Sequence, residues 1–294
     1  MDQSSAARLK VIFSMFLYGT IGVFVRYIPL PSSVIAMMRG LIGAPFLLLV
    51  LLLTKRRMSG GDIRRNLLPL CLSGILLGVN WILLFEAYRF TTVATATLCY
   101  YFAPIILVAV SPLLFGERMT ARKLLCILAA LFGMVFVSGV AENGMPTAGE
   151  LKGVLLALGA ACFYASVVIC NKKIHGVSAY DKTIMQLAMA AAVLLPYNMV
   201  SGSFRGMELG GIVLPMLLIV GVVHTGFAYC LYFGSMEHLK GQTLAILSYI
   251  DPVVAVLLSA LLLREPTSVW MLLGAVLILG AAVVSELPEK KKAE

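Results

Sequence analysis

Charged residues are scarce in this chain. Lys, Arg, Asp and Glu together make up 13% of the 294 residues, whereas hydrophobic residues make up 61%. Soluble domains carry about 25% charged and about 45–50% apolar residues. The composition therefore excludes an ordinary soluble domain, and the mean hydropathy of +0.98 agrees with this. We expect an integral membrane protein, with the lipid bilayer as its surroundings.

Sequence motifs for catalysis, metal binding and nucleotide binding are also lacking. The six cysteines lie inside apolar runs, at spacings that fit neither a zinc site nor a disulfide framework. The sequence has no His-Glu-x-x-His run, no Gly-x-Ser-x-Gly elbow and no phosphate-binding loop. We therefore expect neither an enzyme nor direct use of ATP, and no cofactor or metal. The net charge of +9 does not indicate nucleic acid, because the basic residues lie in short loops between apolar runs.

Ten apolar runs of about 20 residues fill most of the chain, each long enough to cross a bilayer as an α-helix. They cover about residues 10–28, 33–54, 67–88, 94–115, 121–139, 152–171, 181–200, 211–233, 242–262 and 268–286. The strands of a β-barrel would be shorter and would alternate apolar with polar residues, which these runs do not. The sequence therefore predicts an all-α membrane protein with ten transmembrane helices.

The basic residues distinguish the two ends of these runs. If the N-terminus is cytoplasmic, 17 of the 23 Lys and Arg residues lie on the cytoplasmic side, five lie on the opposite side, and Arg39 lies within the second run. Short cytoplasmic loops carry an excess of positive charge. We therefore predict a multi-pass protein of the cytoplasmic membrane with both termini in the cytoplasm.

The two halves of the chain carry matching residues 148 positions apart. Pro104 and Glu117 match Pro252 and Glu265, and each pair is separated by 13 residues. Further matches at this offset are Gly78 with Gly226, Thr95 with Thr243 and Tyr101 with Tyr249. Five helices per half is an odd number, so the second half must enter the membrane from the opposite side. We predict two inverted repeats, residues 1–145 and 146–294, which is typical of secondary transporters.

Asp251 is the leading candidate for a functional residue. It lies near the middle of the ninth run, directly before Pro252, and a carboxylate at that depth is costly unless it is protonated, paired or hydrated. Pro252 lacks a backbone donor and is expected to open the helix locally, as Pro104 would in the fourth run. Asp251 is predicted to bind a substrate ammonium or to couple transport to protons. The alternative is a structural role, as a paired or neutral buried residue.

Two other polar residues lie inside predicted helices. His224, near the middle of the eighth run, is predicted to pair with Asp251 or to relay a proton. The alternative is a neutral core histidine bonded to a carbonyl. Arg39 lies about two turns into the second run. It has three options: to extend outward to the surface, to bind a substrate carboxylate, or to pair with Asp251 or Glu86.

Aromatic and amide side chains are the second group of candidates. In hydrocarbon their polar atoms need partners, so the deeper ones should face protein or water. An aromatic-lined cavity with one anion suits an organic cation or a zwitterion. It suits a flat amphiphilic metabolite nearly as well, and helix packing is the alternative for any single tyrosine. The predicted substrate-binding residues are Asp251, Tyr249, Tyr101, Tyr100, Trp81, Asn80, His224, Tyr229 and Arg39.

These features together resemble the drug/metabolite transporter superfamily, specifically its EamA-type members. The resemblance covers about residues 10–286 and is carried by the run YYFAPIILVAVSPLLFGERMT (Tyr100–Thr120), which is answered by SYIDPVVAVLLSALLLREPTS (Ser248–Ser268). It implies a central cavity between the repeats, and transport of small metabolites, amino acids or amphiphilic compounds by alternating access, often coupled to protons.

We therefore predict a secondary transporter whose small-molecule substrate lies near the membrane midplane, in contact with the third, fourth, eighth and ninth runs. A uniporter, a channel and a non-transporting scaffold stay open as alternatives. The internal repeat builds the cavity without a second copy, so the sequence is compatible with a monomer or a homodimer.

Overall fold

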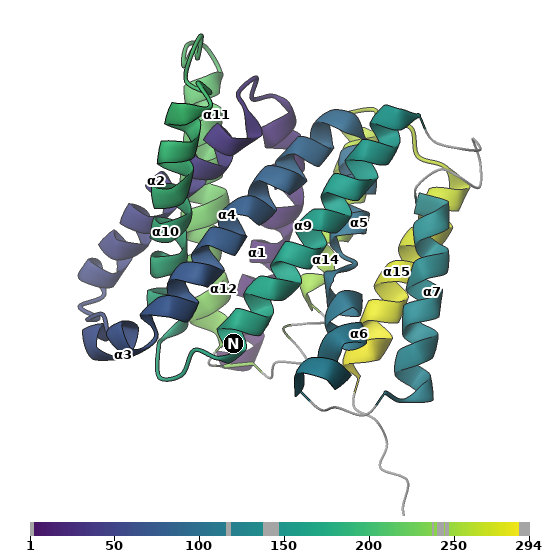
Figure 1. The fold of residues 1–294 in the computed structure, drawn as a ribbon, viewed down its shortest axis with the longest axis horizontal. Helices are drawn as coiled ribbons and strands as arrows, with labels where there is room; N and C mark the ends of the chain where they lie inside the picture. Colours follow the sequence, from purple (N-terminus) through teal and green to yellow (C-terminus); the bar gives the residue numbers. More distant parts are fainter. Residues whose placement is uncertain are drawn as a thin grey trace, which may run out of the picture.

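The computed structural model describes residues 3–115, 119–137, 147–236, 238–239, 244 and 247–287. All regular secondary structure within these residues is helical (Figure 1). The elements are α1 (Gln3–Arg26), α2 (Ser32–Leu53), α3 (Gly60–Arg65), α4 (Leu67–Phe90), α5 (Val93–Tyr100), α6 (Ala103–Phe115), α7 (Ala121–Val137), α9 (Ala148–Lys172), α10 (Ala179–Val200), α11 (Val213–Leu218), the π-helix η1 (Ile219–Phe227), α12 (Ala228–Met236), α14 (Ile250–Leu261) and α15 (Val269–Glu286).

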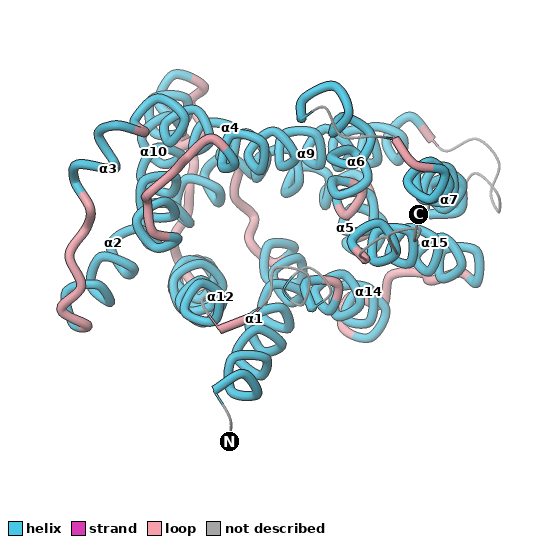
Figure 2. The backbone as a smooth tube through the Cα atoms, turned by 90° about the horizontal axis from the view of Figure 1, so that it is seen from below, coloured by secondary structure: helices cyan, strands magenta, loops and turns pink. Residues whose placement is uncertain are grey.

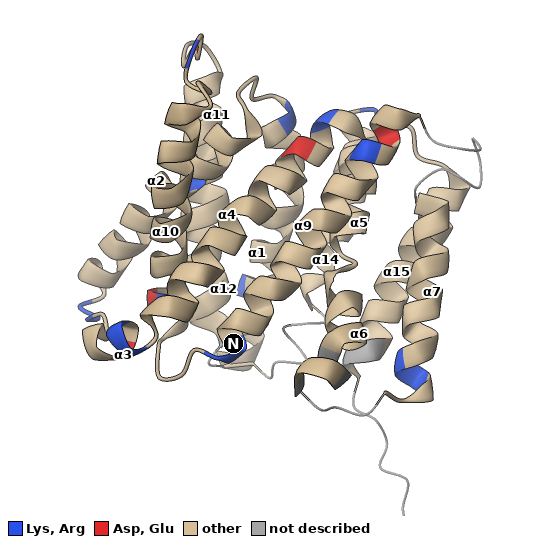
Figure 3. Cartoon of the chain, viewed as in Figure 1, with Lys and Arg blue, Asp and Glu red and all other residues tan. Residues whose placement is uncertain are grey.

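The helices confirm the all-α membrane fold. Among the described residues, seven helical segments are long and apolar enough to cross a membrane, and Ile250–Leu261 and Val269–Val284 form two shorter apolar helices. Each of the ten predicted runs overlaps a helical segment. Figure 3 shows the charged residues gathered at the two ends of the bundle, with few between them. Many large apolar side chains, such as Leu68 and Val200, are exposed on the outside, where lipid would cover them.

Side-chain caps explain where several helices begin. The first N–H groups of a helix have no partner within the helix, so a neighbouring side chain must accept from them. In each case the hydroxyl accepts from the backbone N–H three residues later; the capping residues are Thr92 for α5, Thr147 for α9, Ser178 for α10 and Ser268 for α15.

The most extensive helix packing joins one half of the chain to the other. Helix α4 packs against α9 and α10, α2 packs against α10, and α7 pairs with α15 at one edge of the bundle (Figure 2). Glycines permit the closest approaches. A Cβ at Gly74 of α4 would lie 2.8 Å from the carbonyl oxygen of Gln186 on α10, and one at Gly40 of α2 would lie 2.6 Å from that of Leu187.

Three of the predicted spans are not continuous α-helices. The fourth breaks at Tyr101 and Phe102, between α5 and α6. In the ninth, α14 begins only at Ile250, so Asp251 lies in the first turn of a helix and not in the middle of one. The eighth contains η1, where π-type turns replace α-turns. Pro104 and Pro252 lie in the first turns of α6 and α14, where a helix does not use the missing N–H.

Candidate functional site

A cavity of about 380 Å³ lies within the bundle, a size typical of small-molecule sites. Helices from both halves of the chain line it. Its most specific feature is tyrosine: eight of the 11 tyrosines of the chain line this one cavity, namely Tyr18, Tyr88, Tyr100, Tyr101, Tyr164, Tyr229, Tyr232 and Tyr249. Two charged residues, Arg39 and Asp251, also line it. The cavity therefore has aromatic walls and two separate charges of opposite sign.

Asp251 is held by Tyr101, which lies at the break in the fourth span. The hydroxyl of Tyr101 donates to Oδ2 of Asp251 at 2.7 Å and also lies 3.2 Å from the carbonyl oxygen of Ser248. The ring centroids of Tyr101 and Tyr249 are 6.0 Å apart. The interruptions of the fourth and ninth spans thus meet at one point on the cavity wall, in line with the internal match of Tyr101 and Tyr249.

The local backbone favours a carboxylate at Asp251. The residue lies in the first turn of α14, where unpaired N–H groups and the helix dipole stabilise negative charge. Helix α1 packs closely on this turn, because a Cβ at Gly19 would lie 2.6 Å from both the carbonyl oxygen of Asp251 and Cβ of Val254. The backbone of Asp251 is therefore fixed from one side while its side chain lines the cavity.

Arg39 is buried, and it makes no ion pair with an acidic side chain among the described residues. Arg39 is 5% exposed. Its Nε donates to Oγ1 of Thr225 at 3.1 Å, and its Cζ lies 4.0 Å from the ring centroid of Trp81. Of the three options for Arg39, extension to the surface is therefore wrong, and so is an ion pair with Asp251 or Glu86. Ser32 donates to Glu86 instead, at 2.7 Å.

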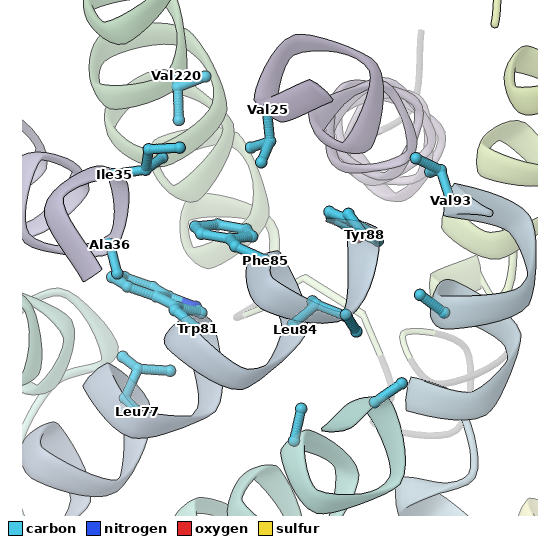
Figure 4. Packing of buried hydrophobic residues seen from close by; sticks show 14 of the residues in the cluster. Val25, Ile35, Ala36, Leu77, Trp81, Leu84, Phe85, Tyr88, Val93 and Val220 are labelled. Carbon is cyan, nitrogen blue, oxygen red and sulfur yellow. The ribbon is translucent and has the colours of Figure 1, made fainter. Parts of the chain in front are cut away.

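Helix α4 supplies the surface beneath Arg39. Trp81, Phe85 and Tyr88 project from one face of α4 toward α2, η1 and α1 (Figure 4). All three line the cavity. The guanidinium of Arg39 lies over the first two of these rings, 5.4 Å from the centroid of Phe85, so its charge is partly stabilised by cation–π contact.

The structure does not bring His224 to Asp251. His224 lies in η1, 1% exposed, with Nε2 2.7 Å from Oγ1 of Thr20 and Nδ1 3.3 Å from the carbonyl oxygen of Ile219. It does not line the cavity, and the partner of Asp251 is Tyr101. The predicted His224–Asp251 pair is therefore wrong, and the geometry is that of a core histidine bonded to its neighbours.

Asn80 also lies behind the cavity wall. It is fully buried, and its Nδ2 donates to the carbonyl oxygen of Ala160 at 2.6 Å, which ties α4 to α9. It does not line the cavity, and neither does Pro252. The other predicted residues, Trp81, Tyr100, Tyr101, Tyr229, Tyr249, Arg39, Asp251 and Pro104, all do.

Sequence reasoning missed a polar strip on one side of the cavity. Gln186 donates from Nε2 to Oγ of Ser73 at 2.8 Å and to Oδ1 of Asn171 at 2.7 Å, and Thr183 lies nearby on α10. Polar residues inside apolar runs were the available signal, because such residues need partners in hydrocarbon.

Tyr18 and Tyr164 were also missed, although the internal repeat pointed to them. The segments FLYG from Phe16 and CFYA from Cys162 align within the loosely matched beginnings of the two repeats, and this alignment pairs the two tyrosines. Both line the cavity, and the buried Tyr18 hydroxyl has no hydrogen-bond partner in the part of the chain that the structure describes.

A second carboxylate joins the far ends of α5 and α14. Oε2 of Glu265 accepts from the backbone N–H of Val93 at 2.8 Å and from the hydroxyl of Ser259, while Oε1 lies 3.5 Å from Nη2 of Arg26. Helices α5 and α14 are thus tied at both ends, by Glu265 at one and by the Tyr101–Asp251 hydrogen bond at the other. The matching residue in the first repeat, Glu117, lies outside the described residues.

Comparison with known proteins agrees with the fold. The model of the EamA-like transporter family matches residues 6–139 and again residues 151–286. An uncharacterized transporter, YxxF, of Bacillus subtilis (strain 168) is 28% identical over 99% of this chain and 93% of its own length. An uncharacterized transporter of Archaeoglobus fulgidus is 29% identical over 94% of each chain. A solved crystal structure superposes with a TM-score of 0.67 over 97% of this chain and 98% of the other, at 20% identity, which shows likeness of fold alone.

Proposed function

The chain belongs to the EamA-like transporter family and is a membrane transporter, and from this premise we propose that it is a secondary active carrier of small organic molecules driven by proton exchange. Asp251 is the coupling residue in this proposal. The observation that carries it is the hydrogen bond between Tyr101 and Asp251, because it sets a single carboxylate on the wall of a tyrosine-lined cavity where the two interrupted spans meet.

Coupling follows from competition for that carboxylate. An ionised Asp251 attracts a substrate ammonium, whereas a protonated Asp251 is neutral and binds it only weakly. If each conformational change requires that Asp251 carry either a proton or a substrate, protons moving one way drive substrate the other way. The Tyr101 hydroxyl donates to the ionised form and holds it toward the cavity.

The aromatic walls favour an organic cation or another flat, positively charged molecule. Tyrosine rings attract cations over their faces, and this attraction is stronger where water is excluded. The eight tyrosines line the same cavity as Asp251 from several helices, and Tyr101 contacts its carboxylate, so a ligand ammonium at Asp251 would also contact rings. This arrangement tolerates different apolar bodies, because most of its contacts depend on shape and not on matched hydrogen bonds.

We further propose that this structure is the inward-facing state, with both termini in the cytoplasm. Tyr232, Asn171 and Thr183, which line the cavity, lie near the ends of their helices on the side predicted to be cytoplasmic. On the opposite side, Glu265 connects α5, Arg26 of α1 and Ser259 of α14. Closure at that end and polar lining at the other support access from the cytoplasm.

The proposal is tested in proteoliposomes with an acidic lumen. The purified protein is screened for uptake of labelled amines, amino acids and quaternary aromatic cations, with and without the pH gradient. We expect gradient-driven uptake that Asp251→Asn abolishes. Glu208→Gln removes an equal charge in the exposed loop between α10 and α11 and should leave uptake unchanged. Uptake that is equal with and without the gradient, in the wild type and in Asp251→Asn, would establish a uniporter and contradict the proposal.

A further inference from the structure

The buried arginine in the cavity is not used by the mechanism above. Arg39 is the one cation among the lining residues, and within the described part of the chain its only hydrogen bond is the one from Nε to Thr225. No acidic side chain there lies within ion-pair distance of it. A charged group at this depth in a membrane is costly, and such residues usually serve a ligand or a partner charge.

Its orientation leaves the hydrogen-bonding end of the guanidinium available. Nε is bound to Thr225, which is fully buried, and one face of the group lies over Trp81. This fixes the plane of the guanidinium while both Nη groups keep their donors. A fixed guanidinium with two free amino groups matches the two oxygens of a carboxylate, to which it can donate two parallel hydrogen bonds.

We propose that Arg39 forms an anion-binding subsite of the central cavity, and that the transported molecule is a zwitterion whose carboxylate binds Arg39 while its ammonium binds Asp251. This inference rests on the proposed function, because it takes the cavity to be the substrate site. The two charged residues come from α2 and α14 and are not paired with each other. The apolar body of the substrate lies among the tyrosines that line the same cavity.

Trp81 provides a direct report of this subsite. The chain has two tryptophans, and the other, Trp270, is 44% exposed on α15, where it packs on Phe136. Trp270→Phe therefore leaves Trp81, beneath Arg39, as the single fluorescent tryptophan. Quenching of its fluorescence by iodide, caesium and acrylamide then measures the access of an anion, a cation and a neutral molecule to Trp81.

Anion access is measured first, on the full-length protein in detergent. We expect iodide to quench Trp81 better than caesium does when each is expressed relative to its quenching of free tryptophan, and Arg39→Gln to remove this preference while quenching by acrylamide stays the same. Arg39→Lys should retain the preference, and Arg205→Gln, the same charge change in an exposed loop, should not alter it. Equal relative quenching by iodide and caesium in the Trp270→Phe protein that keeps Arg39 would overturn the proposed anion subsite. This outcome can be read even if Arg39→Gln does not fold.

The substrate class is measured with three probes that share one body: phenylalanine, phenethylamine and 3-phenylpropanoate. Binding is followed by Trp81 fluorescence. A charge-assisted hydrogen bond to the carboxylate should make phenylalanine bind about tenfold more tightly than phenethylamine, and Arg39→Gln should make the two equal. Equal affinities in the unaltered cavity, or no binding of phenylalanine, overturn the zwitterion. Because neither measurement involves transport, a failure here is distinct from a failure of proton coupling.

Discussion

The fourth and ninth spans are both interrupted at matching positions, but only one of them carries a carboxylate at the break. Tyr101 matches Tyr249 and Pro104 matches Pro252, whereas Asp251 in the second repeat matches Ala103 in the first. Both breaks reach the cavity, and Ala103 lines it as Asp251 does. Both halves therefore have a break in the helix at this position, but only the second half carries a charged residue there.

This difference has a physical rationale. Two carboxylates at neighbouring helix starts would repel each other, and one would stay protonated. A single carboxylate that receives a hydroxyl from the opposite repeat avoids that repulsion, since Tyr101 donates across the junction.

The largest effect should come from moving the carboxylate. Asp251→Ala should abolish gradient-driven uptake, because no group is left to exchange proton for substrate. In that background Ala103→Asp sets a carboxylate in the first turn of α6, on the wall of the same cavity. We expect the double variant to regain part of the gradient-driven uptake measured in proteoliposomes. No recovery, in a protein that folds as the wild type does, would mean that the two breaks are not equivalent.

The contacts of Glu265, at the far end of the α5–α14 pair, should come next in size. Glu265→Gln removes the negative charge that faces Arg26 and weakens the acceptor for the Val93 N–H; charge-assisted hydrogen bonds contribute about 1.5–3 kcal/mol each. We expect a lower melting temperature in detergent and faster labelling of a cysteine introduced at Ala255, which lines the cavity, by an impermeant reagent added from outside. Unchanged melting and labelling would show that this contact does not close that end of the cavity.

The hydroxyl at the junction should have a smaller, selective effect. Tyr101→Phe removes the donor to Asp251 but keeps the ring, and we expect substrate affinity to fall about tenfold, corresponding to one charge-assisted hydrogen bond. The matched variant is Tyr249→Phe, at the position in the second repeat that corresponds to Tyr101. It should have the smaller effect, because the hydroxyl that donates to Asp251 is that of Tyr101. Titration of ligand binding in both variants distinguishes them, and a larger loss in Tyr249→Phe would contradict this assignment.

The smallest effect is expected at His224. It is bonded to Thr20 and to the carbonyl oxygen of Ile219, away from the cavity lining. His224→Gln should therefore keep the dependence of uptake on the pH gradient and change mainly the melting temperature. If instead the variant transports but no longer responds to the gradient, His224 is part of the proton path after all.

The segments that cross the membrane were predictable from the sequence, but rotation about the helix axis was not. Runs of apolar residues indicate which segments cross, and this is why each predicted run overlaps a helical segment. His224 was assigned to the wrong neighbours because π-type turns in η1 rotate side chains away from an α-helical register. The place of Arg39 over Trp81 depends on contact between α2 and α4, which no local pattern records.

Binding of either a proton or a substrate by Asp251 is tested most directly by proton release when substrate binds. The protein in detergent, in weak buffer at a series of pH values from acid to neutral, receives the compound with the highest uptake in the liposome screen, and the pH change is recorded at each. We predict that the wild type releases protons as the compound binds and that Asp251→Asn releases none. Binding without proton release in the wild type, or equal release from both proteins, would contradict the account.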